Sequence, residues 1–221
     1  MLRGVLVCLL ALEMTAWCQD VHPVTGRHAA PVMGMGGAPW LVRPEREAEE
    51  APDEALDAIG IPKGTVAADI GAGVGYFTWR LAERVGPAGR VYAVDVQPGM
   101  LKQLRQNMAE RKLANYEAVL GSEDDPHLPA ARIDLALLVD TYHEFSQPVK
   151  MVEQIRASLK PDGRMVLLEY RKEDPKVPIR PEHKMSVAEV KAEIEPQGFR
   201  LEKTLETLPR QHILIFRKNV M

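Results

Sequence analysis

A run of glycines flanked by acidic residues is the part of the sequence best suited to hold a ligand. Gly71, Gly73 and Gly75 follow the apolar stretch 66–70, and Asp69 stands two residues before the first of them. Glycine has no Cβ, so the backbone can turn sharply and a ligand can lie directly against it. A carboxylate at this place would repel a pyrophosphate, but it could accept hydrogen bonds from a cationic amine.

Asp95 ends the next apolar stretch, 91–94, and completes this first group. A carboxylate there can accept hydrogen bonds from both hydroxyls of a ribose. The glycine spacing is G-x-G-x-G, whereas a dinucleotide site uses G-x-G-x-x-G and would need glycine at Tyr76. The pattern therefore favours a nucleoside ligand with a positive group, and a nicotinamide site is the weaker alternative.

A second group of reactive side chains follows the apolar stretch 133–139. His143 has an unperturbed pKa of about 6.5 and could take a proton from an acceptor hydroxyl. Glu144 could orient this histidine or act as the base itself. The alternative is that Tyr142 and His143 only shape the pocket, because alignment alone can supply much of the rate.

More cations and histidines follow the apolar stretch 165–168 and Glu169. Arg171 and Lys184 could bind an acidic acceptor, or they are ordinary exposed cations. No structural metal is predicted, although an acid-and-histidine site stays open, because the histidines outside this region lack metal-ligand spacing. Those histidines are His22, His28, His127 and His212.

Alternating strand and helix patterns position these groups. Apolar residues at a four-residue spacing predict a helix over 76–85, and Pro98 suits the first turn of the next helix. A third helix would turn Val149, Val152, Ile155 and Leu159 inward. The near-continuous apolar run 133–139 is typical of a strand covered on both faces. The predicted strands of this part are 66–70, 91–94, 116–120, 133–139 and 165–169.

The end of the chain has a different pattern. Ser186 and Glu189 form a capping box that begins a helix, and Gly198 ends it. The strands 199–205 and 212–216 have only a short connection, so they should be antiparallel. The predicted fold is α/β: a doubly wound, mostly parallel seven-stranded sheet with a C-terminal antiparallel hairpin.

With these segments in order, the chain resembles the class I S-adenosylmethionine-dependent methyltransferases. The resemblance covers roughly residues 55 to 217 and rests on the segments 68–76, 91–95, 133–140 and 159–164. It implies S-adenosylmethionine as cofactor. It also implies that the glycine loop passes the methionine part of the cofactor, through Gly71, Ala72, Gly73, Gly75 and Tyr76.

The resemblance assigns the acidic residues as well. Asp69 would orient the methionine part, Asp95 would hold the ribose hydroxyls, and Val96 would lie beside the adenine. Asp140 would help to line the pocket. An acid against the adenine amino group is expected after the third strand. Our choice is Asp124, with Glu123 and Asp125 as near alternatives or the whole cluster as a solvated loop.

The function that this resemblance implies is methyl transfer to an oxygen, nitrogen or other nucleophile of a small molecule. A cofactor-binding module without catalysis and a nicotinamide oxidoreductase are the alternatives. The net charge of -3 gives no support for a nucleic-acid surface. No apolar run reaches the roughly 18 residues that span a bilayer. The sequence does not indicate an oligomeric state.

The first 54 residues are expected to lie outside the catalytic domain, 55–221. Residues 1–18 have the pattern of a signal peptide, because Arg3 precedes the apolar run 5–12 and small residues precede a candidate cut after Cys18. Residues 19–54 would form an irregular arm or a lid over the ligand site. Export and the cytoplasmic supply of the cofactor point to different locations, so the localisation stays open.

Overall fold

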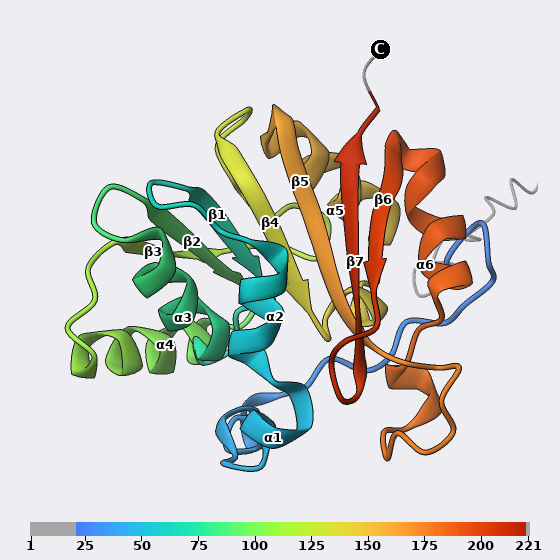
Figure 1. Ribbon diagram of the computed structural model, residues 1–221, viewed down its shortest axis with the longest axis horizontal. Helices are drawn as coiled ribbons and strands as arrows, with labels where there is room; N and C mark the ends of the chain where they lie inside the picture. Colours follow the sequence, from blue (N-terminus) through green and yellow to red (C-terminus); the bar gives the residue numbers. More distant parts are fainter. Residues whose placement is uncertain (1–20, 220–221) are drawn as a thin grey trace, which may run out of the picture.

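The computed structural model describes residues 21–219, and the predicted signal peptide lies outside this range. One seven-stranded sheet has the order β3-β2-β1-β4-β5-β7-β6 (Figure 1). Strands β1 to β5 run parallel, and β7 pairs antiparallel with both β5 and β6. The predicted fold is confirmed. The strands are β1 Val66–Ile70, β2 Arg90–Asp95, β3 Tyr116–Leu120, β4 Ile133–Val139, β5 Leu159–Tyr170, β6 Phe199–Leu205 and β7 Gln211–Lys218.

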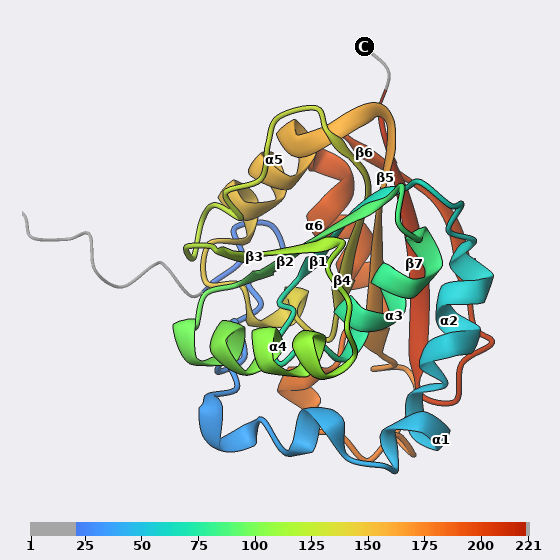
Figure 2. The same cartoon turned by 90° about the vertical axis from the view of Figure 1, so that its left-hand side faces the viewer.

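Helices cover both faces of the sheet (Figure 2). The helices α2 (Pro52–Ile59), α3 (Tyr76–Val85) and α4 (Pro98–Glu110) share one apolar core. The helices α5 (Pro148–Ser158) and α6 (Val187–Ile194) share the other. Each fully buried aliphatic side chain contributes about 1.5–3 kcal/mol to the free energy of folding. These two cores hold the strand ends, and thus the loops that follow them, in fixed positions.

The charged run 43–59 contains two helices, because Ala51 adopts a left-handed conformation and separates α1 (Arg46–Glu50) from α2. Two local predictions were wrong. Val149 in α5 is 40% exposed, and Pro148 and Met151 are buried instead. Strand β5 begins at Leu159 rather than 165, and residues 160–163 bulge out of its pairing with β4.

The N-terminal arm crosses the carboxyl ends of the parallel strands. Its residues 21–45 contain two short 3-10 turns, Met35–Gly37 and Trp40–Val42, and no longer helix. In Figure 1 the arm passes beside α6 and continues along the lower edge of the sheet to α1. In the second turn, Trp40 and Val42 are exposed, while Leu41 is half-buried and lies close to Gly73. Among the helices described, none combines the length and apolar character that a bilayer crossing requires.

Candidate active site

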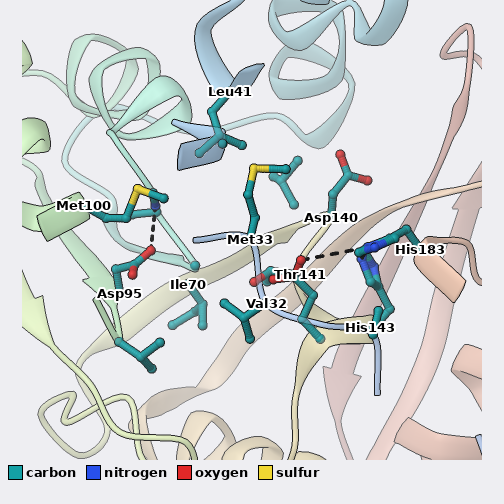
Figure 3. Close-up of a pocket in the computed structure, with 18 of the residues that line it drawn as sticks. Val32, Met33, Leu41, Ile70, Asp95, Met100, Asp140, Thr141, His143 and His183 are labelled. Carbon is teal, nitrogen blue, oxygen red and sulfur yellow. Dashed lines mark hydrogen bonds and ion pairs between the residues drawn. The ribbon is translucent and has the colours of Figure 1, made fainter. Parts of the chain in front are cut away.

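A cavity of about 1090 Å³ lies between the arm and the carboxyl ends of β1, β2 and β4. In Figure 3, Asp95 and Met100 lie on one side of Val32 and Met33, and His143 and His183 lie on the other. Most of the residues predicted for the site line this cavity. They are Asp69, Gly71, Ala72, Gly73, Tyr76, Asp95, Val96, Asp140, His143 and Glu144.

The glycine loop is shaped by backbone contacts that leave no room for side chains. The N–H groups of Gly71 and Ala72 both donate to the carbonyl of Val94, at 2.9 Å. Gly71 has a φ of +74°, and a Cβ added there would come within 2.1 Å of the Thr141 hydroxyl. This tight turn between β1 and α3 presents bare backbone to the cavity, as close approach of a ligand requires.

Asp95 is held in place by two backbone donors. Its Oδ2 accepts from the N–H of Gly73 at 2.9 Å, and its Oδ1 accepts from the N–H of Gln97 at 2.8 Å. Burial raises the pKa of this carboxyl. Each carboxylate oxygen can accept a further hydrogen bond, so Asp95 is preorganised for a pair of hydroxyl donors.

Two more carboxyls face the cavity with raised pKa values. Burial raises the pKa of Asp69 to about 6, although its Oδ2 accepts a 2.6 Å hydrogen bond from Thr78. Burial and the nearby carboxyls of Glu50 and Glu169 raise the pKa of Asp140. Its Oδ1 is buried and has no hydrogen-bond partner within residues 21–219. Carboxyls in this state would be stabilised by a ligand that carries positive charge.

A histidine pair occupies the other part of the cavity. The Nδ1 of His143 lies 2.6 Å from Glu169 Oε2, and its Nε2 lies 3.1 Å from His183 Nδ1. Burial works against a charge on His143, but Glu169 outweighs it and raises the pKa of the imidazole. Burial also raises the pKa of Glu144 to about 7. Glu144 Oε1 lies 3.9 Å from His183 Nδ1.

Three residues predicted for the site do not reach the cavity. Tyr142 is completely buried in the core beneath α5 and α6, because its turn directs the ring away from the cavity. Asp124 accepts from the Ser122 hydroxyl at 2.8 Å and faces Lys150, while Ser122 and Glu123 line the cavity instead. Gly75 begins α3 and would meet Leu104 if it carried a Cβ.

The two cations proposed for an acidic acceptor are engaged elsewhere. The guanidinium of Arg171 pairs with Glu206 at 2.9 Å and donates to the carbonyl of Pro209. The ammonium of Lys184 donates to the carbonyl of Val177 at 2.5 Å. Arg171 therefore ties the start of the segment 171–184 to the residues 206–209, and Lys184 fixes the fold within the segment itself.

The sequence did not indicate two features of the site. One is the contact of Glu169 with His143, for which the only signal was a charged residue at the end of an apolar strand. The other is Arg46, which forms a buried 2.6 Å ion pair with Glu50 and lies 4.3 Å from the ring centroid of Tyr76. No local pattern marked Arg46 as a residue that lines the cavity.

Comparison with known proteins identifies the family. Residues 61–207 match the family model described as a methyltransferase domain. The chain belongs to this family. It is 26% identical to the crystal structure of a SAM-dependent methyltransferase from Aquifex aeolicus, with a TM-score of 0.79 over 84% of this chain and 98% of that one. Residues 61–207 therefore form a methyltransferase domain, the family whose cofactor is S-adenosylmethionine.

Two curated relatives show how varied the acceptors of similar chains are. A demethylmenaquinone methyltransferase of Geobacillus sp. (strain WCH70) is 28% identical over 53% of this chain and 50% of its own length. A protein-L-isoaspartate O-methyltransferase of Methanothrix thermoacetophila is 30% identical over 50% of each chain. The methyltransferase-domain protein spans about half the length of these relatives.

The cavity fits the cofactor. S-adenosylmethionine carries an ammonium and a sulfonium, and the buried, unpartnered oxygen of Asp140 and the raised pKa of Asp69 indicate a place for positive charge. Asp95 offers fixed acceptors for ribose hydroxyls. Gly71 adopts its φ of +74° without strain and has no Cβ, which leaves the backbone of the turn open to the ligand.

Proposed function

We propose that this protein is an S-adenosylmethionine-dependent methyltransferase that acts on a small molecule bound in the cavity beside His143. The names of the relatives include a quinone precursor and a protein, so the names alone do not select an acceptor. The N-terminal arm favours a small acceptor, because its residues Val32, Met33 and Leu41 line the cavity from the side away from the sheet. A covered cavity favours a compact acceptor over a protein chain.

The glycine-loop part of the cavity is assigned to the cofactor. Asp95 would hold the ribose, and Gly71, Ala72 and Gly73 would lie against the methionine part, whose ammonium pairs with Asp69. Val96 and Glu123 line the neighbouring wall, where adenine would lie. When bound, the cofactor supplies a methyl group on a sulfonium sulfur, which makes the methyl carbon electrophilic.

His143, Glu144 and His183 are assigned to the acceptor. The observation that carries this proposal is that the buried carboxylate of Glu169 fixes His143 Nδ1, at 2.6 Å, in the same cavity as Asp95. The Nε2 of His143 then lies next to His183, where an acceptor hydroxyl would meet it. With an apparent volume of about 1090 Å³, the cavity exceeds the roughly 300–1000 Å³ of an ordinary ligand pocket, so it has room for cofactor and acceptor.

We also propose that residues 21–46 are the cover of this cavity and that the catalytic domain proper is 55–221. Gln97, at the start of α4, donates to the carbonyl of Met33 at 2.9 Å, and Tyr76 donates to Glu47 at 2.6 Å. These contacts connect the arm and α1 to the cofactor loop. Cofactor exchange would then require the arm to move.

An acceptor screen with methyl-labelled cofactor tests the proposal. Hydroxylated and amine-bearing small molecules, quinols among them, are incubated with the enzyme, and labelled products are identified by mass spectrometry. Asp95→Asn should raise the Kd for the cofactor by about 10- to 100-fold, because hydrogen bonds to a charged group are worth about 1.5–3 kcal/mol. His143→Ala should lower kcat while it leaves the cofactor Kd within about twofold.

Asp57→Asn is the matched control for Asp95→Asn, because Asp57 lies on the exposed face of α2, where its carboxylate pairs with Arg84 at 3.1 Å. It should change neither parameter. Label that appears on a protein and on no small molecule would contradict the proposed acceptor class. Equal loss of cofactor affinity in Asp95→Asn and His143→Ala would contradict the division of the cavity into two parts.

A further inference from the structure

His143, Glu144 and His183 form a cluster whose chemistry the proposed function leaves unassigned. Each offers one ligand atom, and these three atoms all lie within 4.8 Å of one another. His143 and Glu144 come from the turn after β4, and His183 comes from the separate turn Pro181–His183. We infer that these three side chains bind a divalent metal ion of the zinc type at the acceptor end of the cavity.

The distances agree with a shared ion. His143 Nε2 and His183 Nδ1 are 3.1 Å apart. Two nitrogens bound tetrahedrally to zinc at about 2.0–2.1 Å would be about 3.3 Å apart. Glu144 Oε1, at 3.9 Å from His183 Nδ1, needs only a small side-chain rotation to complete a set of three.

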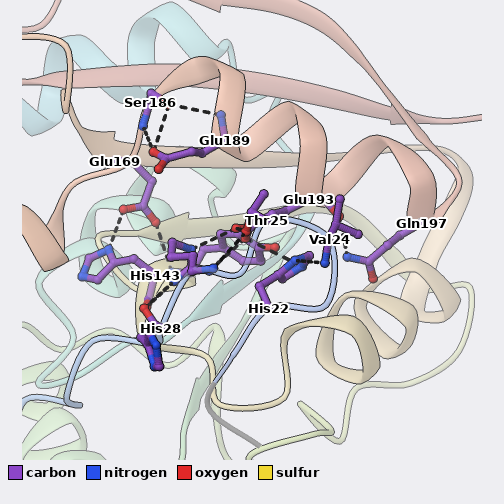
Figure 4. Close-up of polar contacts among 12 residues, drawn as sticks. His22, Val24, Thr25, His28, His143, Glu169, Ser186, Glu189, Glu193 and Gln197 are labelled. Atoms are coloured by element: carbon purple, nitrogen blue, oxygen red, sulfur yellow. Dashed lines mark hydrogen bonds and ion pairs between the residues drawn. The ribbon is translucent and has the colours of Figure 1, made fainter. Parts of the chain in front are cut away.

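Glu169 supplies the support that metal-binding histidines usually have. In such sites the ring nitrogen that does not bind the metal donates its N–H to a carboxylate, which fixes the tautomer and the ring orientation. His143 Nδ1 donates to Glu169 Oε2 at 2.6 Å, and Glu169 Oε1 accepts from the backbone N–H of Tyr142 at 3.1 Å. Figure 4 shows this contact between Glu169 and His143. With the proton of the neutral ring on Nδ1, the lone pair of Nε2 is available to a metal ion.

The set of ligands selects the class of ion. Two imidazoles and one carboxylate suit zinc and other transition metals, whereas magnesium and calcium prefer oxygen ligands alone. The carboxylates of Glu144 and Glu169 would balance the double positive charge. Three protein ligands leave one position of a tetrahedral ion free, as in catalytic zinc sites. That position would face the cavity that the three ligands line.

This inference rests on the proposed function and narrows its acceptor to a compound with a hydroxyl group. A hydroxyl on the free position would lose its proton more readily, because the ion stabilises the oxygen's negative charge. The O–H bond breaks, the proton passes to solvent and the electron pair stays on oxygen. That pair forms the new bond to the methyl carbon, and the carbon–sulfur bond breaks with its electrons passing to sulfur.

Metal titration of the chelator-treated protein tests the inference apart from methyl transfer. Zinc binding is followed by calorimetry, and cobalt serves as a second probe because its visible spectrum reports tetrahedral nitrogen and oxygen ligands. Wild type should bind one equivalent of either ion, with magnesium unable to compete. His183→Ala and Glu144→Gln should each lower zinc affinity by at least about tenfold, and Glu169→Gln should lower it by about 10- to 100-fold.

Two controls keep the result interpretable. His28→Ala removes an exposed histidine of the arm and should leave zinc affinity unchanged. The cofactor Kd of each variant shows whether the fold of the cavity persists, which matters most for the buried Glu169. Zinc binding that survives His183→Ala, or a wild type that binds no zinc, would overturn the inference. So would full methyl transfer by the metal-free enzyme, which would favour His143 as a base instead. Zinc binding without any methylated acceptor would leave the metal site standing and contradict the proposed acceptor class.

Discussion

Asp69 shows how a single residue of the site responds to pH. Its pKa in the folded protein is raised from 3.8 to about 6 by burial, with Asp95 adding to the effect and Thr78 and Arg46 opposing it. Because the pKa of Asp69 is higher in the folded state than in the unfolded state, protonation of Asp69 stabilises the folded state. This contribution is complete at a pH below 3.8, the pKa of the unfolded state, and is lost as the pH rises through about 6. The shift of about two units corresponds to about 3 kcal/mol.

Asp69→Asn should therefore remove a pH dependence from the cofactor-free protein. Between about pH 4 and 6.5, the unfolding free energy of the wild type should fall by about 2 kcal/mol more than that of the variant. Urea unfolding at several pH values measures the difference, and other buried carboxyls cancel because both proteins contain them. Parallel curves for the two proteins would mean that Asp69 does not titrate in this range.

The residues of the site were predictable where the local strand pattern determines the direction of the side chain. Asp69, Gly71 and Asp95 lie at strand ends or in the turn that follows, so strand periodicity places them at the cavity. Tyr142 and Asp124 follow strands in the same way, but their directions depend on contacts from distant segments. Tyr142 packs under the guanidinium of Arg27, at 5.6 Å from the ring centroid, which no local pattern could reveal.

At the scale of elements, the turn between β1 and α3 is the most constrained part of the site. Gly71→Ala should lower the unfolding free energy by about 1–3 kcal/mol, because an L-residue is strained at a φ of +74°. The added methyl would also collide with Thr141, which follows β4. Thermal unfolding and cofactor titration should both show the damage.

Gly34→Ala is the matched control for this substitution. A Cβ there meets nothing within 4 Å, and the φ of -75° suits any residue. Stability and cofactor affinity should then stay within about 0.5 kcal/mol of wild type. Thr141→Ala added to Gly71→Ala should restore part of the loss, because it removes the hydroxyl that the new Cβ would touch first. Equal stability of Gly71→Ala and wild type would show that the turn is not as constrained as its geometry indicates.

Elements with strong periodicity were predicted almost to the residue. The bounds of β1, β3, β4 and β6 agree with the apolar and alternating patterns. The central strands β1 and β4 bury nearly continuous sets of side chains, whereas β3 and β6, at the edges of the sheet, are only partly buried. Patterns failed where backbone geometry decides. The left-handed Ala51 divides one charged run into two helices, and the bulge at 160–163 belongs to β5 only through its pairing with β4.

On the scale of the whole molecule, the arm is held in place by an ion pair between Arg27 and Glu193, which are 166 positions apart in the sequence. Arg27 forms a two-pronged ion pair with the buried Glu193 of α6, at 3.0 Å from Nε and 2.9 Å from Nη2. Thr25 donates to the same carboxylate at 2.5 Å (Figure 4). The composition of the arm predicted an irregular segment, but only the tertiary structure reveals the partner that fixes it across the cavity.

Arg27→Ala should therefore release the arm from the cavity. Breaking a buried ion pair leaves an uncompensated buried charge and costs about 3–5 kcal/mol. The arm has only two short turns of its own, so this loss should exceed the free energy that keeps it in place. The amides of residues 21–46 should exchange with deuterium faster, while those of β1 and β4 keep their protection. Cofactor affinity should fall as well, because Met33 and Leu41 would no longer close the cavity.

The exposed pair Arg90–Glu117 provides the comparison, since each side chain is about half exposed. Arg90→Ala should cost less than about 1 kcal/mol and leave exchange in the arm unchanged. If Arg27→Ala also leaves the arm protected, the 3-10 turns and the contacts of Gln97 and Tyr76 suffice to hold it. If exchange in the arm becomes faster but cofactor affinity does not fall, the arm does not contribute to cofactor binding. An arm that contributes to binding must lower the cofactor affinity when it is released.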